Sequence, residues 1–178
     1  GLGYAPNQWN ALHRHLHSMG YSDQELVTAK VAAVGKKGLP FDLFRGRVMF
    51  PIIDLRGNVV AFGARALGDE QPKYLNTGDT PVFKKSRNLF ALNFAKGQKS
   101  SFLILCEGYM DVIALHQAGF RMAVATLGTA LTPEQARILT QYTSEVLLSY
   151  DADAAGQKAT KRASAILDQV GLQIRVLK

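Results

Sequence analysis

The chain has 178 residues, of which 47% are hydrophobic and 20% are charged, as in an ordinary soluble globular protein of one or two small domains. No apolar run approaches the roughly 20 residues that cross a bilayer, so we expect no membrane-spanning helix. Cys106 is the only cysteine, which excludes an intrachain disulfide and a multi-cysteine zinc site. Because Cys106 lies within an apolar run, we expect it to be buried rather than nucleophilic.

The formal net charge of +7 is unevenly distributed along the chain. Residues 1–100 contain 14 Lys and Arg against 7 Asp and Glu, whereas residues 101–178 contain 7 of each. A basic surplus confined to one half suits a surface that binds a polyanion, although an ordinary solvated surface would give the same count.

The first 35 residues predict two helices. Pro6 suits the first position of a helix, apolar residues then recur at helical spacing, and Gly20 ends the pattern. Ser22 and Glu25 form a capping box, which predicts a second helix over residues 23–34.

The next part of the chain predicts an antiparallel hairpin followed by loops. Residues 47–54 and 59–65 have strand-like composition and are separated by a turn at 55–58. Pro51 indicates an edge position or a bulge, because proline cannot donate to a ladder. Residues 68–86 are rich in loop-forming residues and in lysine.

From Ser101 onward, strands and helices alternate. The expected strands are 102–106, 121–126, 145–150 and 172–177, and the expected helices are 110–118, 133–142 and 155–169. This order predicts a parallel sheet with right-handed crossovers. The apolar runs do not alternate with polar residues, as expected for strands that are buried on both faces.

Two acidic clusters directly follow two of these apolar runs. Glu107 and Asp111 follow the first strand, and Asp151 and Asp153 follow the third. Open α/β sheets bind ligands at the carboxyl ends of their strands, so we expect these carboxylates at one edge. Their mutual repulsion favours a bound cation, and hard oxygen ligands suit Mg²⁺. Any one of them, taken alone, could instead be a helix cap or a turn former.

The motifs around these residues resemble a known family. A Glu-Gly pair after one strand, with Asp-x-Asp-x-x-Gly after another, resembles the TOPRIM domain of bacterial-type primases, type IA and type II topoisomerases, OLD-family nucleases and RecR-like repair proteins. Longer segments are similar to bacterial DNA primases of DnaG type. These segments are 45–52, 61–65, 72–77, 107–112, 125–130 and 149–156.

The resemblance implies roles for particular residues. It implies that Glu107, Asp151 and Asp153 are catalytic, and that they bind the catalytic metals together with Asp111. It further implies that nucleotide and template are held by Arg47, Arg65, Lys73, Tyr74, Asn76 and Lys85.

The implied fold is α/β. Residues 101–178 would form a TOPRIM domain, a Rossmann-like parallel sheet flanked by helices, truncated at its carboxyl end. Residues 1–100 would form part of a small α+β basic subdomain. The family has a further Asp-Pro-Asp motif and a helical subdomain after the fourth strand, and an amino-terminal module that binds zinc, so we expect an incomplete metal site here. Ala152 and Ala154 depart from the family's usual Gly and Arg or Lys, and Ala154 predicts some loss of phosphate affinity.

The implied activity is that of a primase, a nucleotidyltransferase that makes short RNA primers during DNA replication with Mg²⁺ or Mn²⁺. The implied partners are a single-stranded DNA template, ribonucleoside triphosphates, the RNA primer and, through regions outside this chain, a replicative helicase of the primosome. The implied location is the bacterial cytoplasm, at the replication fork, without a membrane. The alternatives are another TOPRIM enzyme, such as a topoisomerase or a nuclease, or a module that only binds nucleotides or single-stranded DNA.

Overall fold

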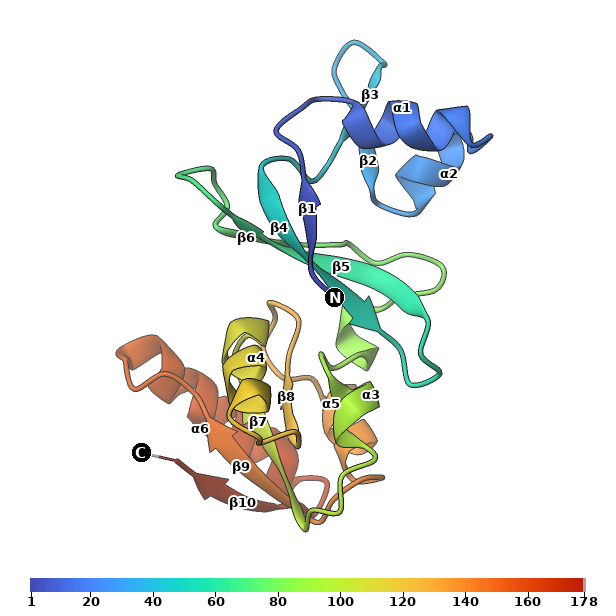
Figure 1. Cartoon of the computed structure of the whole chain (residues 1–178). Helices are drawn as coiled ribbons and strands as arrows, with labels where there is room; N and C mark the ends of the chain where they lie inside the picture. The colour runs from blue at the N-terminus through green and yellow to red at the C-terminus, as the bar shows by residue number, and fades with distance from the viewer. Residues whose placement is uncertain (178) are drawn as a thin grey trace. The chain divides into compact units, whose positions relative to one another are not determined.

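The computed structural model describes residues 1–177 and divides into two compact units. Unit 1 comprises Gly1–Ile52 and Val59–Lys84, and unit 2 comprises Ile53–Asn58 together with the chain from Lys85 onward. Figure 1 labels the helices and strands of both. Within the described residues, no helix is both long enough and apolar enough to cross a membrane.

Unit 1 is built on a four-stranded sheet with the order β1-β4-β5-β6. Its strands are β1 (Gly3–Ala5), β4 (Arg47–Ile53), β5 (Val59–Ala66) and β6 (Tyr74–Asn76). Strands β4 and β5 form the expected hairpin, closed by a bond from the Asp54 amide to the Asn58 carbonyl at 2.9 Å. Strand β1 pairs with β4 only as far as Met49, so Pro51 occupies an edge position.

The helical part of unit 1 is shorter than the sequence predicts. Helix α1 covers Ala11–Ser18 and helix α2 covers Asp23–Thr28. The prediction that Pro6 opens the first helix is wrong, because Pro6 directly follows β1 and helix α1 begins only at Ala11. The second helix also ends early: Lys30 has a φ of +57°, and β2 (Ala32–Val34) pairs with β3 (Pro40–Asp42).

Side-chain caps hold both helices. The predicted capping box of α2 is present: Ser22 Oγ accepts from the Glu25 amide at 3.3 Å, and Glu25 Oε2 accepts from the Ser22 amide at 2.7 Å. Helix α1 receives its cap from far along the chain. The buried Asp42 carboxylate accepts from the amides of Leu12 at 2.7 Å and His13 at 2.8 Å.

Unit 2 contains the predicted parallel sheet, in the order β10-β9-β7-β8. Its strands are β7 (Phe102–Cys106), β8 (Ala123–Ala125), β9 (Glu145–Ser149) and β10 (Gln173–Val176). Its long helices are α4 (Tyr109–Gln117), α5 (Pro133–Leu139) and α6 (Ala154–Asp168). All seven elements agree with the expected ranges to within a few residues.

The central strand β7 is buried on both faces. Leu103 and Leu105 pack in one core cluster with residues of α5 and α6. Ile104 and Cys106 pack in a second cluster with Val112 of α4. This three-layer packing explains the apolar run, because both alternating sets of side chains need an apolar neighbour. Cys106 is fully buried, and that burial raises the pKa of its thiol to about 12.

Two short elements of unit 2 were not expected from the sequence. They are the 3-10 helix η1 (Lys85–Arg87) and helix α3 (Leu92–Ala95). The buried Gln135 side chain of α5 secures the segment at η1 by donating to the carbonyls of Lys85 at 2.9 Å and Asn88 at 2.8 Å.

Candidate functional site

Glu107 and Asp151 emerge at the same edge of the unit 2 sheet, as the sequence predicts. Strands β7 and β9 are parallel neighbours with Cys106 opposite Ser149, so the chain leaves both strands at the same level. Glu107 Oε1 accepts a hydrogen bond from the Asp151 amide at 3.3 Å, which links the two strand ends. This carboxyl edge is where open α/β sheets bind their ligands.

Asp153 and Asp111 also serve as helix caps. Asp153 is the N-cap of α6, and its Oδ1 accepts from the Gly156 amide at 2.7 Å. Asp111 Oδ2 accepts from the Gly108 amide at 3.2 Å at the start of α4. A carboxylate has about four lone-pair sites, so one capping bond leaves each of them able to ligate a cation.

Gly156 is required by the close approach of the loop to α6. A Cβ atom at this position would lie 2.0 Å from the Asp151 carbonyl oxygen and 3.0 Å from Glu107 Oε1. The Gly108 position is less crowded, with the Asp111 carboxylate 3.4 Å from an added Cβ. The glycine of the Asp-x-Asp-x-x-Gly motif is therefore needed for the arrangement of the two acidic loops themselves.

The carboxylates influence one another electrostatically. Burial raises the pKa of Glu107, and the negative charges of Asp151, Asp153 and Asp111 raise it further, against the lowering effect of the Asp151 amide. Asp111, Asp151 and Asp153 are exposed. Glu107 thus carries its proton more readily than an ordinary glutamate does.

The donor chemistry of this edge fits a divalent cation, but the side chains do not form a ready-made cage. Carboxylate oxygens are the ligands that Mg²⁺ and Mn²⁺ prefer, and a cation would relieve the repulsion around Glu107. Among residues 1–177, no three His, Cys, Asp or Glu side chains are close enough together to hold a metal ion.

A cavity of about 310 Å³ adjoins Glu107 at the strand ends. Thr126, Tyr150 and Arg162 are among the residues that line it. Burial raises the pKa of the Tyr150 hydroxyl, so Tyr150 is present there as a neutral phenol. Arg162 contributes a cation to the cavity that Glu107 also lines, and a guanidinium of this kind can bind an anionic group.

Five of the six predicted nucleotide-binding residues lie in unit 1. Arg65 of β5 is directly opposite Tyr74 of β6, and Gly63 is opposite Asn76. Directly opposed residues project on the same face of a sheet, so Arg65, Tyr74 and Asn76 share one face. Lys73 precedes β6, with its Nζ atom 6.0 Å from the centre of the Tyr74 ring.

Arg47 is the most buried of these basic residues, with 4% of its surface exposed. Its Nη1 donates to the Lys73 carbonyl at 3.4 Å, and no carboxylate in residues 1–177 forms an ion pair with it. Arg65 is half-buried, and its Nε lacks a hydrogen-bond acceptor within the described chain. Buried guanidinium groups with spare donors are the expected counterparts of an anionic ligand.

Lys85, the sixth predicted binding residue, lies in η1 of unit 2 rather than on the unit 1 sheet. Five of the predicted binding residues thus lie in one compact unit, and Lys85 lies in the other with the four carboxylates.

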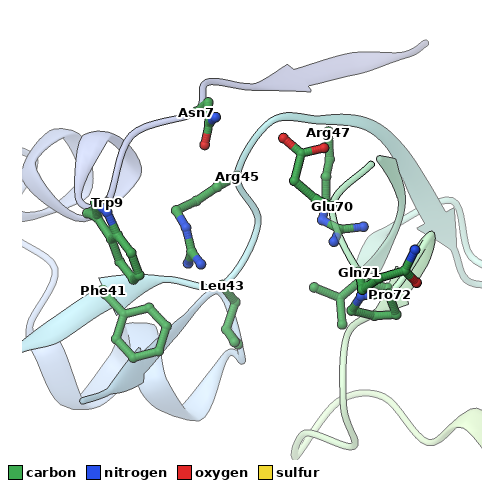
Figure 2. Close-up of a pocket in the computed structure, with 10 residues that line it drawn as sticks. Asn7, Trp9, Phe41, Leu43, Arg45, Arg47, Glu70, Gln71 and Pro72 are labelled. Carbon is green, nitrogen blue, oxygen red and sulfur yellow. The ribbon is translucent and has the colours of Figure 1, made fainter. Parts of the chain in front are cut away.

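Sequence reasoning missed a cluster of aromatic and basic residues in unit 1. The guanidinium carbon of Arg45 lies 4.2 Å from the centre of the Trp9 ring and 5.4 Å from that of Phe41. Figure 2 shows these three side chains at a pocket that Arg47 also lines. Trp9 is the only tryptophan of the chain, and it lies before α1, in the segment that the sequence predicted to be helical from Pro6 onward.

Comparison with known proteins decides the family. Residues 1–96 match the family described as the N-terminal domain of the DNA primase catalytic core. The chain belongs to the DNA primase catalytic core family. Residues 104–178 match the family described as Toprim-like. The primase match over residues 1–96 favours a primase over the topoisomerase and nuclease alternatives, because it covers the part that lies outside the Toprim region.

Curated relatives of the chain come from several bacteria. It is 48% identical to the DNA primase of Clostridium acetobutylicum over 179 residues, with 100% of the chain and 30% of the relative covered. It is 44% identical to the DNA primase of Treponema pallidum, with 99% of the chain and 29% of the relative covered. The chain therefore spans less than a third of the length of these relatives.

Solved primase structures share the fold. A DNA primase domain from Pseudomonas aeruginosa matches with a TM-score of 0.91 and 42% identity, over 99% of this chain and 57% of that one. A DnaG primase catalytic domain bound to single-stranded DNA matches with a TM-score of 0.88 and 38% identity, over 99% of this chain and 56% of that one. A primase structure from Aquifex aeolicus is described as containing zinc-binding and RNA polymerase domains; its TM-score is 0.89 at 42% identity, over 98% of this chain and 44% of that one.

Proposed function

We propose that this chain is the part of a bacterial DNA primase that builds short RNA primers on single-stranded DNA. The observation that carries the proposal is the set of carboxylates at the ends of β7 and β9 in a chain of the primase core family. In this reaction, the 3′ hydroxyl of the growing RNA attacks the α-phosphate of an incoming ribonucleoside triphosphate, and pyrophosphate leaves.

In this proposal, Glu107, Asp111, Asp151 and Asp153 hold divalent metal, Mg²⁺ or Mn²⁺, at the edge of the sheet. The metal, when bound, orients the phosphates and stabilises the charge that develops on them. Glu107 is also placed to accept the proton of the attacking hydroxyl, because its raised pKa moves it toward the range in which general bases work. Asp151 and Asp153 lie at the exposed rim and would bind the substrate through metal.

The basic residues Arg47, Arg65, Lys73, Tyr74, Asn76 and Lys85 hold the template and the incoming nucleotide in this proposal. The buried guanidinium of Arg47 and the spare Nε donor of Arg65 support phosphate binding. The matched DnaG catalytic domain, which is bound to single-stranded DNA, supports the template as a partner.

The remaining assignments rest on the family. We propose residues 1–100 as part of the basic subdomain and residues 101–178 as the TOPRIM domain. Zinc would be bound by a separate module, as the description of the Aquifex aeolicus primase suggests for that protein. The site of action would be the replication fork in the bacterial cytoplasm, with contacts to the replicative helicase made by parts of the primase outside this chain.

The proposal is tested by primer synthesis with the full-length primase carrying Asp151→Asn or Glu107→Gln. We expect each variant to lose at least about 100-fold in rate, the usual scale for removing a group that acts in the transition state. Asp168→Asn is the matched control, because Asp168 is an exposed aspartate at the opposite end of α6 and should leave synthesis unchanged. Near-normal synthesis by both site variants would refute the assignment.

A second function, binding of single-stranded nucleic acid without synthesis, remains open for the 178-residue chain taken alone. The basic surplus of residues 1–100 favours it. Binding with a steep dependence on salt, together with no primer synthesis by the same chain, would support the binding function.

A further inference from the structure

The segment of residues 85–90 carries Lys85, a residue proposed above to bind nucleotide, and lies in the same compact unit as the four carboxylates. It begins with the 3-10 helix η1, a single turn of three residues. The bond that closes this turn, from the Asn88 amide to the Lys85 carbonyl, is long at 3.5 Å. A turn this short satisfies few of its own backbone groups, so its position depends on neighbouring elements.

The far end of the segment is fixed to the edge of the parallel sheet. Phe90 forms an antiparallel bridge with Ala125 of β8, in which the Phe90 amide donates to the Ala125 carbonyl at 2.8 Å. Ala125 is opposite Cys106, and Cys106 is opposite Ser149. The centre of the Phe90 ring also lies 5.6 Å from that of Tyr109 in α4. The bridge therefore places Phe90 at the level where β7 and β9 end and the acidic loops begin.

The near end of the segment is held by Gln135 of α5. The amide nitrogen of its side chain donates to the carbonyls of Lys85 at 2.9 Å and Asn88 at 2.8 Å, which uses both of its protons. The side-chain oxygen accepts from the Thr132 amide at 3.0 Å. Thr132 adds a further link, because its hydroxyl donates to the Ser86 carbonyl at 2.8 Å. The capping box of α5 thus holds the segment at three carbonyls.

Packing alone does not explain a glutamine at position 135. Gln135 is fully buried, and its helix neighbours Ala136 and Leu139 belong to the apolar core. A buried amide is costly unless it is hydrogen-bonded, so an apolar side chain would serve the core at least as well. Only an amide, however, supplies two donors to carbonyls that lie 47 and 50 residues earlier in the chain. The position of the segment is what the glutamine determines.

We propose that Gln135, assisted by Thr132, is a positioning residue that sets the place of Lys85 at the carboxyl edge of the sheet, and with it the binding of the incoming nucleotide. The inference rests on the proposed function, in which Lys85 binds nucleotide, and extends it to two residues that do not themselves touch the substrate. Because Lys85 holds the nucleotide before as well as during the reaction, its displacement should raise KM more than it lowers kcat.

The test is primer synthesis by the full-length primase, with KM for ribonucleoside triphosphates and kcat measured separately. Gln135→Met keeps an unbranched side chain of similar length but removes both donors. We expect it to raise KM roughly tenfold, within the approximately 100-fold that a misplacement of about 1 Å can cost. Gln141→Met is the matched control, because Gln141 is an exposed glutamine just beyond α5 and should leave KM unchanged.

Thr132 supplies a milder test with its own rescue. Thr132→Val removes the hydroxyl with little change in shape and should raise KM about threefold, the scale of one ordinary hydrogen bond. Thr132→Ser keeps the hydroxyl and should restore KM to that of the unchanged protein. Urea midpoints of all variants identify any that are weakened by general destabilisation.

A double-mutant cycle separates positioning from a general effect on the enzyme. If Gln135 acts through Lys85, adding Gln135→Met to Lys85→Ala should raise KM no further. Hydrogen–deuterium exchange gives a second measurement that needs no activity. The amides of residues 85–90 should exchange faster in the Gln135→Met protein, whereas those of β9 should not change.

The outcomes distinguish this inference from the proposed function. A normal KM for Gln135→Met, whatever the exchange shows, would overturn the inference and leave the proposed function intact. Additive effects of Gln135→Met and Lys85→Ala would do the same, and so would unchanged exchange in the segment. A normal KM for Lys85→Ala would instead refute the nucleotide-binding role of Lys85 in the proposed function, and the inference with it.

Discussion

Each of the two units is stabilised internally by a different kind of contact. In unit 2, a parallel sheet lies between helices, and the alternate side chains of β7 are buried on opposite faces. In unit 1, helix α1 has no buried residue and depends on a carboxylate from β3, 30 residues away, for its cap. The elements of unit 2 are therefore fixed mainly by continuous apolar packing, whereas helix α1 of unit 1 is fixed by individual polar contacts.

The largest expected effect is a loss of stability in unit 2, caused by a substitution at its acidic loops. Gly156→Ala places a Cβ atom 2.0 Å from the Asp151 carbonyl oxygen, so backbone must move at the start of α6. We expect a loss of about 3 kcal/mol in the free energy of unfolding, the upper end for overpacking. Urea denaturation followed by far-ultraviolet circular dichroism measures it.

Gly97→Ala is the control for this variant, since an added Cβ there would meet no atom within 4 Å. If the Gly156→Ala variant unfolded at the same urea concentration as the control, the close contact would not be present in solution.

A smaller effect should appear in unit 1 when its polar contact is removed. Asp42→Ala leaves the amides of Leu12 and His13 without their acceptor, which should cost about 2 kcal/mol, as for a strong helix cap. Because Trp9 belongs to unit 1, its emission follows the unfolding of that unit. The urea midpoint seen by Trp9 should fall, whereas Asp69→Ala, at an exposed aspartate of the same unit, should leave it unchanged. Equal midpoints for the two variants would show that the Asp42 cap is unimportant.

The smallest effect concerns Glu107 and depends on pH. Its pKa is raised in the folded protein, so its contribution to stability is present below the ordinary pKa of a glutamate and is lost as pH rises through the raised value. Without metal, Glu107→Gln should therefore raise the melting temperature near pH 7 by about 1–2 °C, with the gain disappearing near pH 4. Thermal melts with a chelator measure this, and Glu134→Gln, at an exposed glutamate of α5, is the control. A lower melting temperature for Glu107→Gln at neutral pH would contradict the raised pKa.

The difference between the two units also explains which elements of the fold could be predicted from the sequence. The strands and helices from Phe102 onward were predicted to within a few residues because each carries its own local signal, either an apolar run or a capped amphipathic stretch. The short strand β2 was predicted as helix, because its hairpin partner β3 lies outside the local window. Pro6 likewise gave a helix signal, but it follows directly on the strand β1 that pairs with β4, and α1 begins only at Ala11.

The candidate site was predictable where it depends on strand order. Glu107 and Asp151 could be placed at one edge from the sequence because parallel strands end at the same side of a sheet. The capping bonds of Asp111 and Asp153 were foreseen only as general alternatives. The contacts of Trp9 with Arg45 and Phe41 could not be predicted, because they join residues that are 32 or more positions apart and follow no periodic pattern.

The distant cap of helix α1 also has a consequence for how unit 1 folds. An eight-residue helix is too short to persist by itself in water, where isolated helices become stable only at about 12–15 residues. Its stabilising carboxylate arrives only after the chain has closed a loop of 30 residues to bring Asp42 to Leu12. We therefore expect α1 to form together with β3 in a single late step, with the entropy of that loop closure as a main contribution to the folding barrier.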